Sequence, residues 1–118
     1  MTRLLAVAAA LTAALAPAAA LAHHGWDAYD AAKPVKITAP LTNISWSNPH
    51  GAAKVAYQGK SWTVLLAPIA RMESRGLTRA RLSAAKSVTL EGQARTDGVA
   101  ELKLERITVD GETINLLR

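Results

Sequence analysis

Residues 53–66 read Ala-Lys-Val-Ala-Tyr-Gln-Gly-Lys-Ser-Trp-Thr-Val-Leu-Leu. Apolar residues occupy every second position from Ala53 to Tyr57 and again from Trp62 to Leu66, which is the period of a half-buried β-strand. Between these two runs, Gln58-Gly59-Lys60 has the composition of a tight turn. The stretch therefore predicts a β-hairpin and indicates that the surrounding domain is mainly β.

One more strand is predicted before the hairpin, from Val35 to Trp46. Its alternation changes phase near Thr42-Asn43, and Pro40 interrupts the strand pattern close to the same place. A change of phase of this kind is typical of a β-bulge, which bends a strand sharply. A strongly curved first strand is what the closure of a small barrel requires.

A short helix and two or three further strands are predicted after the hairpin. Pro68 suits the first position of a helix, and Gly76 suits its C-terminal end. Strand patterns then run from Val88 to Ala94 and from Leu102 to Val109, with Asp97-Gly98 as the turn between them.

Three strands, a helix and two or three more strands is the order of the OB barrel, in which a helix joins strands three and four. We therefore predict a mainly β fold, a small five- to six-stranded OB-like barrel with one short helix between strands three and four. This single domain is expected to span residues 35–118. The alternative is an open antiparallel sheet with a helix across one face.

Residues 1–22 have the three-part pattern of a secretory signal peptide. Arg3 provides the positive start, Leu4–Ala16 is uncharged and apolar, and Ala20-Leu21-Ala22 is a small-residue cleavage site. The pattern predicts cleavage before His23 and delivery to the periplasm or the exterior of a bacterial cell, without a stable membrane anchor afterwards. Cleavage two residues earlier is the alternative.

The composition restricts the possible chemistry. The chain has 118 residues and no cysteine, so a disulfide scaffold, a thiolate zinc site and a thiol nucleophile are excluded. Between Lys33 and Lys86, nine basic residues stand against a single acid, Glu73. Arg71, Arg75 and Arg79 in this block are expected to form a solvated face. The alternative is a functional patch that favours anions, lipid headgroups or an acidic partner. A basic OB-like barrel is compatible with binding of single-stranded nucleic acid, but export separates the protein from nucleic acid, so no such partner is predicted.

The three histidines are the candidate metal ligands. His23 and His24 stand at the predicted mature N-terminus, and His50 follows the first long strand. A free α-amino group together with imidazole nitrogens forms an all-nitrogen set that suits Cu(II) above other first-row divalent ions. The sequence therefore makes copper the candidate cofactor, although exposed terminal histidines also bind copper weakly without a built site.

Residues 23–34 are predicted to be an N-terminal arm, and Trp46-Ser47-Asn48-Pro49-His50 is the densest cluster of distinctive residues in the chain. In the functional interpretation, Trp26 docks the arm, while Trp46 and Asn48 form a binding loop beside His50. No serine stands in a Gly-x-Ser-x-Gly context, and no acid–base pair is evident. Catalytic residues are therefore not predicted, and the protein is expected not to be an enzyme.

Two hypotheses follow from these features. The first is a periplasmic or secreted binding module that holds copper through its histidines. The second is a metal-free interaction barrel, in which the arm and the Trp46–His50 loop bind a periplasmic protein or a small ligand.

The motifs of the mature chain resemble those of a domain-of-unknown-function family of small exported bacterial proteins. The resemblance covers almost the whole mature chain, and it implies an exported single-domain protein without a settled activity. It rests on the following motifs: Ala22-His23-His24-Gly25-Trp26, Trp46-Ser47-Asn48-Pro49-His50, Trp62, Leu66-Ala67-Pro68, Arg75-Gly76-Leu77-Thr78, Gly92, Arg106-Ile107 and Asp110-Gly111.

Overall fold

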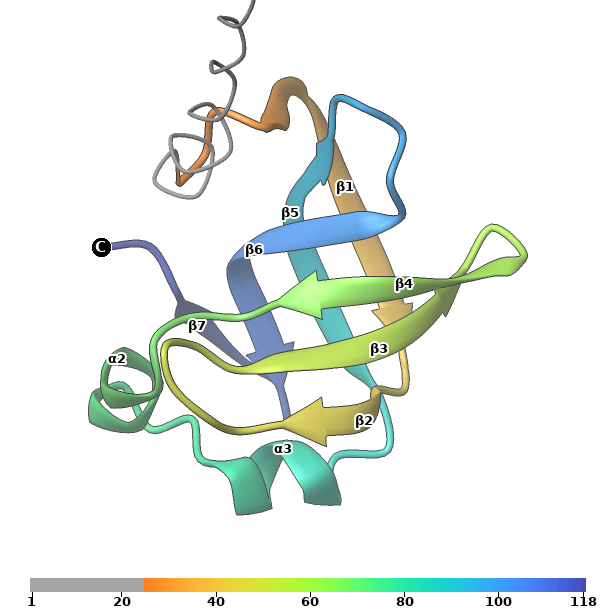
Figure 1. Ribbon diagram of the computed structural model, residues 1–118. Helices are drawn as coiled ribbons and strands as arrows, with labels where there is room; N and C mark the ends of the chain where they lie inside the picture. Colours follow the sequence, from red (N-terminus) through yellow and green to blue (C-terminus); the bar gives the residue numbers. More distant parts are fainter. Residues whose placement is uncertain (1–24) are drawn as a thin grey trace, which may run out of the picture.

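The computed structural model of the protein describes residues 25–118, so the predicted signal peptide, His23 and His24 lie outside the described residues. The described part of the chain folds as a bent β-sheet with two short helices at one end (Figure 1). In chain order, the elements are β1 (Tyr29–Ala39), β2 (Thr42–Ser45), β3 (Ala52–Tyr57), β4 (Lys60–Leu65), α2 (Ile69–Ser74), α3 (Arg79–Ala84), β5 (Val88–Arg95), β6 (Glu101–Val109) and β7 (Glu112–Asn115).

The predicted hairpin is confirmed as β3 and β4. Val55 pairs with Trp62 and Ala53 pairs with Val64 across the two strands, and all four side chains are buried. The turn at Gln58-Gly59 has positive φ at both residues, which matches the right-handed twist of the strands that it joins.

The strands form one seven-stranded sheet in the order β1-β5-β6-β4-β3-β2, with β7 also paired to β6. Every pairing is antiparallel except the short parallel one between β4 and β6. The first half of β6 pairs with β4, and its second half pairs on the same side with β7 (Figure 1). Since β6 changes neighbours along its length, it joins two parts of the sheet that run in different directions.

The predicted closed barrel of five to six strands is wrong, because the sheet has seven strands and is not closed. β1 and β2 stand at the two ends of the strand order and do not pair with each other. The predicted single strand from Val35 to Trp46 is divided at Pro40, which has no N–H to donate to a ladder. β1 pairs with β5 before this division, while β2 pairs with β3 after it.

The predicted helix position is also wrong by one strand. Because the chain divides at Pro40, the hairpin contributes the third and fourth strands, and α2 and α3 follow strand four rather than strand three. Pro68 precedes α2 as expected, and Gly76 lies after it with φ of +88°. The hydroxyl of Thr78 accepts a hydrogen bond from the backbone N–H of Arg81 and caps α3.

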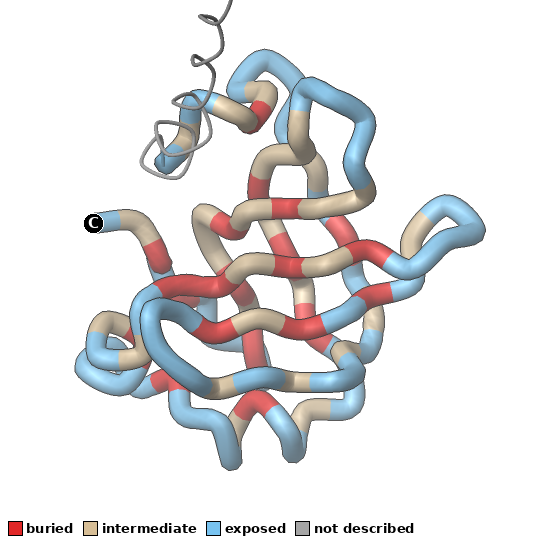
Figure 2. The backbone as a smooth tube through the Cα atoms, viewed as in Figure 1, coloured by how far each residue is buried: buried red, intermediate tan, exposed pale blue. Residues whose placement is uncertain are grey.

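The core lies on the inner face of the bent sheet and beneath the two helices. Figure 2 shows buried positions alternating along the central strands, while the hairpin tip and the loops are exposed. The completely buried side chains include Val64, Leu90, Leu102, Ile107 and Val109. No helix within residues 25–118 is long and apolar enough to cross a membrane.

Candidate functional site

The described part of the predicted arm lies against the start of β6. The Lys103 ammonium donates a hydrogen bond to the Gly25 carbonyl at 3.0 Å and lies 4.6 Å from the centre of the Trp26 ring. Trp26 in turn packs edge-on against Tyr29, with the ring centres 6.1 Å apart. A cation over an aromatic ring is attracted by the ring's electron-rich face, so Lys103 fixes both the backbone and the side chain of the arm.

Tyr29 provides a second anchor for the arm. It is the first residue of β1, so Tyr29–Pro34, which were predicted to be part of the arm, belong to this strand instead. Its hydroxyl donates a hydrogen bond to Glu101. Arg95 lies beside both groups, 3.6 Å from the Glu101 carboxylate and 5.8 Å from the centre of the Tyr29 ring. Burial, together with the hydrogen bond to Glu101, raises the pKa of Tyr29 to about 12.

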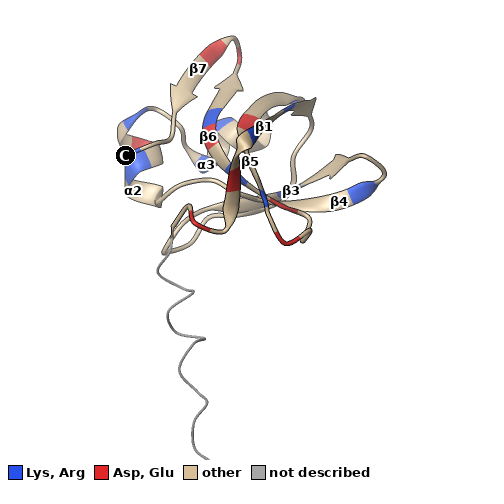
Figure 3. Cartoon of the chain, turned by 90° about the horizontal axis from the view of Figure 1, so that it is seen from above, with Lys and Arg blue, Asp and Glu red and all other residues tan. Residues whose placement is uncertain are grey.

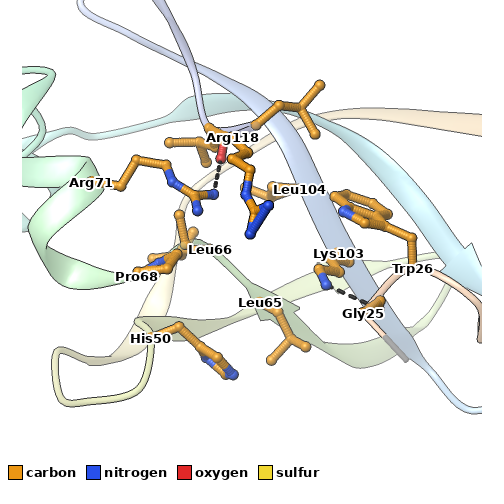
Figure 4. A pocket seen from close by; sticks show the side chains of 13 residues that line it. Gly25, Trp26, His50, Leu65, Leu66, Pro68, Arg71, Lys103, Leu104 and Arg118 are labelled. Atoms are coloured by element: carbon orange, nitrogen blue, oxygen red, sulfur yellow. Dashed lines mark hydrogen bonds between the residues drawn. The ribbon is translucent and has the colours of Figure 1, made fainter. Parts of the chain in front are cut away.

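A cavity of about 450 Å³ lies between the arm, the loop after β2 and the end of the chain (Figure 4). We call it the arm–loop cavity. Its lining comes from five separate segments: Gly25-Trp26, His50, Leu65–Pro68 with Arg71, Lys103-Leu104, and Leu116–Arg118. The volume lies within the range of small-molecule binding sites in proteins.

His50 reaches the arm–loop cavity because its neighbour Gly51 is held close to the core. The Gly51 N–H donates to the Ala67 carbonyl at 3.0 Å, and its carbonyl accepts from the Leu66 N–H at 2.9 Å. A Cβ at Gly51 would lie 2.9 Å from the end of Met72. Because Gly51 has no side chain, its backbone can pack this closely against the core. The exposed His50 next to it therefore lies at the mouth of the cavity.

Three cationic side chains line the same cavity. Figure 4 shows Arg71, Lys103 and Arg118 projecting into the space opposite His50 and Leu65. Within residues 25–118, no ion pair joins any of these three cations to a carboxylate. Burial lowers the pKa of Lys103, and the positive charge of Arg71 lowers it further. The cavity is therefore apolar in its walls and positive on one side.

Two of the predicted site residues come together in this cavity, Trp26 and His50. Trp46 and Asn48 do not line it. The indole N–H of Trp46 donates to the Glu73 carboxylate at 3.4 Å and ties the loop to α2. Asn48 is exposed, and its bond to Pro49 is cis.

Only one of the three predicted metal ligands lies within residues 25–118. His50 is the one histidine in this part of the chain, and no group of three histidine, cysteine, aspartate or glutamate side chains in it could hold a metal ion. His23 and His24 lie outside the described residues. His24 directly precedes Gly25, however, and Gly25 lines the arm–loop cavity together with His50.

Arg71, Arg75 and Arg79 do not share one helical face, because Arg71 lies in α2, Arg75 follows its end and Arg79 begins α3. Arg75 and Arg79 are exposed as expected, whereas Arg71 is half-buried. The Arg71 guanidinium donates to the Leu116 carbonyl at 2.9 Å. The Arg75 guanidinium donates to the carbonyls of Asn115 and Leu117 at 2.7 and 2.6 Å. Figure 3 shows this basic helix directly beside the C-terminal end of the chain. α2 therefore holds the segment after β7 in place as one wall of the arm–loop cavity.

Sequence reasoning considered Arg71 only together with Arg75 and Arg79, and it did not single out Lys103 or Arg118. Arg71 stands in a helix, Lys103 in a strand and Arg118 after the last strand, and each one alone resembles an ordinary solvated charge. The alternation of Lys103 with Leu102 and Leu104 indicates only that its side chain leaves the core. The pairing of β6 with β4, which brings these segments together, has no local sequence signal.

The sequence matches none of the curated proteins with which it was compared. It does match the model of a family of unknown function, DUF6152, over residues 10–103. This match includes the arm, the Trp46–His50 loop, both helices and the start of β6. The chain therefore belongs to this family of unknown function.

Proposed function

We propose that the protein is an exported binding module, without catalytic activity, which holds a small ligand in the arm–loop cavity. The observation that carries this proposal is that Gly25 and Trp26 of the arm, His50 of the loop and Lys103 of β6 line one cavity. Binding sites of this size combine mainly apolar walls with a few polar groups that orient the ligand. The arm–loop cavity has this character, with leucine walls and cations on one side.

The way in which the cavity is assembled also supports binding. Its walls do not depend on one flexible loop, because Lys103 fixes the arm, the Gly51 backbone fixes His50, and Arg71 fixes Leu116. A site that is formed before the ligand arrives binds with a smaller cost in ordering entropy. Export of the module rests on the predicted signal peptide.

The test is to fill the cavity. Leu65 lines it and is only partly buried, so Leu65→Trp can place an indole there without disturbing the deeper core. An uncharged dye, N-phenyl-1-naphthylamine, is expected to increase in fluorescence saturably on binding the wild-type protein. Its affinity is expected to fall by at least about tenfold in Leu65→Trp, a loss of about 1.4 kcal/mol of binding free energy.

Val99→Trp is the matched control, because it adds the same ring at an exposed position away from the cavity. Its dye affinity is expected to equal that of the wild type. Equal dye binding by the wild type and Leu65→Trp would contradict the proposal that the arm–loop cavity is the binding site.

Copper binding is the second candidate function, and one observation favours it. Because Gly25 and His50 line the same cavity, His24 is one peptide bond away from a segment that faces His50. Imidazole nitrogens from His24 and His50, with the α-amino group and imidazole of His23, would form a set suited to Cu(II). The candidate ranks second because Arg71, Lys103 and Arg118 bring positive charge to this cavity, and positive charge disfavours a cation.

Copper titration of the exported protein, after its N-terminus has been established by intact mass, tests this candidate. A built site predicts sub-micromolar Cu(II) affinity (on the order of −8 kcal/mol or stronger) that is lost in both His23→Ala and His50→Ala. If His50→Ala leaves the affinity unchanged, the histidines do not converge and only a terminal chelator remains.

A further inference from the structure

We propose that the ligand of the arm–loop cavity is a small organic anion, a carboxylate with an aliphatic body. This inference rests on the proposed function, since it names the class of ligand for that same site.

The charges of the cavity lead to the anion. Arg71, Lys103 and Arg118 project into one space, and no ion pair joins them to a carboxylate within residues 25–118 (Figure 4). Glu101 attracts Lys103 weakly, but its carboxylate already accepts the Tyr29 hydroxyl and lies beside Arg95. A cluster of three cations with so little opposing charge favours a ligand of opposite sign.

The state of Lys103 supports the same conclusion. Its side chain is half-buried, and its ammonium donates a hydrogen bond to the Gly25 carbonyl. The positive charge of Arg71 also acts on this ammonium. Both burial and the charge of Arg71 disfavour the protonated form. A carboxylate placed between Arg71 and Lys103 would relieve this repulsion, and charge-assisted hydrogen bonds are the stronger kind.

The apolar walls lead to the aliphatic body. Besides Trp26, the apolar part of the lining is made of Ala67, Pro68 and the leucines at positions 65, 66, 104, 116 and 117. The Lys103 ammonium already lies 4.6 Å from the centre of the Trp26 ring, where it competes with a ligand ring for stacking on the indole. The cavity therefore offers apolar contact to a branched or straight aliphatic chain, and an aromatic ring gains no additional stacking on the Trp26 indole.

The experiment uses three probes on the exported protein: hexanoate, hexanamide and acetate. Hexanamide keeps the body of hexanoate without its charge, and acetate keeps the charge without the body. We expect hexanoate to bind at least about tenfold more tightly than either of the others, measured by NMR titration. This preference is expected to weaken as NaCl is added, because salt screens the charges.

Two charge-removing variants make the test independent of folding effects. Lys103→Met removes a cation but also a bond to the arm, whereas Arg118→Met removes an exposed cation that donates none of the hydrogen bonds found in residues 25–118. Each is expected to weaken hexanoate binding by about tenfold and to leave hexanamide binding unchanged. Lys103→Arg keeps the charge and is expected to retain binding. Lys36→Met, an exposed lysine on β1, is the control without effect.

The outcomes separate the two levels of the proposal. Equal affinities for hexanoate and hexanamide, both reduced by Leu65→Trp, would overturn the anion inference and leave the binding function standing. Binding of acetate as tight as that of hexanoate would overturn the aliphatic body. If no probe binds and the uncharged dye does not bind either, the inference and the proposed function fall together.

Discussion

Replacing Gly92 with alanine is expected to reduce the free energy of unfolding by about 3 kcal/mol or more. Gly92 is buried in β5 opposite Leu104 of β6, at the register shift where β6 bends. A Cβ at this position would lie 2.2 Å from the carbonyl oxygen of Lys103 and 3.0 Å from the Cα of Leu104. These are backbone atoms, so no side-chain rotation can relieve the clash and the two strands must move apart.

Urea denaturation of the wild type and Gly92→Ala measures this loss. Gly98→Ala is the control, because Gly98 has φ of +88° but nothing within 4 Å of its Cβ position. Its expected cost is about 1 kcal/mol, from the left-handed backbone alone. A loss below about 1 kcal/mol for Gly92→Ala would mean that the strands separate there at little cost, which contradicts the close approach.

The bend at Gly92 also matters for the site. It lies beside Lys103, the residue that holds the arm and lines the arm–loop cavity. A shift of β6 at this point would displace Lys103 from Gly25 and Trp26. Gly92→Ala is therefore expected to impair ligand binding as well as stability, through the position of one strand.

Arg81→Met is expected to reduce the free energy of unfolding by about 2 kcal/mol. The guanidinium of Arg81 joins α3 to the turn between β6 and β7. It donates to the carbonyls of Gly76 and Val109 at 3.1 and 3.2 Å and pairs with Glu112 at 2.8 Å. The Glu112 side chain is largely exposed, so most of the loss comes from the two hydrogen bonds to backbone carbonyls.

Arg79→Met is the matched control for this substitution. Arg79 lies in the same helix, is exposed, and takes part in none of the side-chain hydrogen bonds or ion pairs within residues 25–118. Its expected effect lies within about 0.5 kcal/mol of zero, as for an ordinary surface substitution. Equal effects of the two substitutions on urea denaturation would show that the contacts of Arg81 contribute nothing measurable.

The local elements could largely be predicted from the sequence. The hairpin of β3 and β4, the helix start at Pro68 and the turn at Asp97-Gly98 each follow from a few neighbouring residues with a clear physical preference. Barrel closure could not be predicted in this way, because it depends on whether the first and last strands meet. Pro40 indicates an irregular position, but whether it bends one strand or divides two depends on which partners lie beside it.

The candidate site could be predicted only in part. The motifs of the sequence indicate Trp26 and His50, and both residues line the arm–loop cavity. The charge that distinguishes this cavity comes from Arg71, Lys103 and Arg118, which are brought together by the pairing of β6 and the fixing of the chain end on α2. Likewise, the hydrogen bonds of arginine side chains to distant carbonyls follow from tertiary structure, so their spacing in a helix resembled a solvated face.

The location of the bound probe provides the most direct test of ligand binding in the arm–loop cavity. Hexanoate titrated into the isotope-labelled protein should change the NMR signals of the Trp26 indole, the Lys103 and Leu104 amides and the Arg71 side chain. These changes should disappear in Leu65→Trp. The contradictory result is a set of changes confined to β2 or the tip of the β3–β4 hairpin, with Trp26 and Lys103 unaffected.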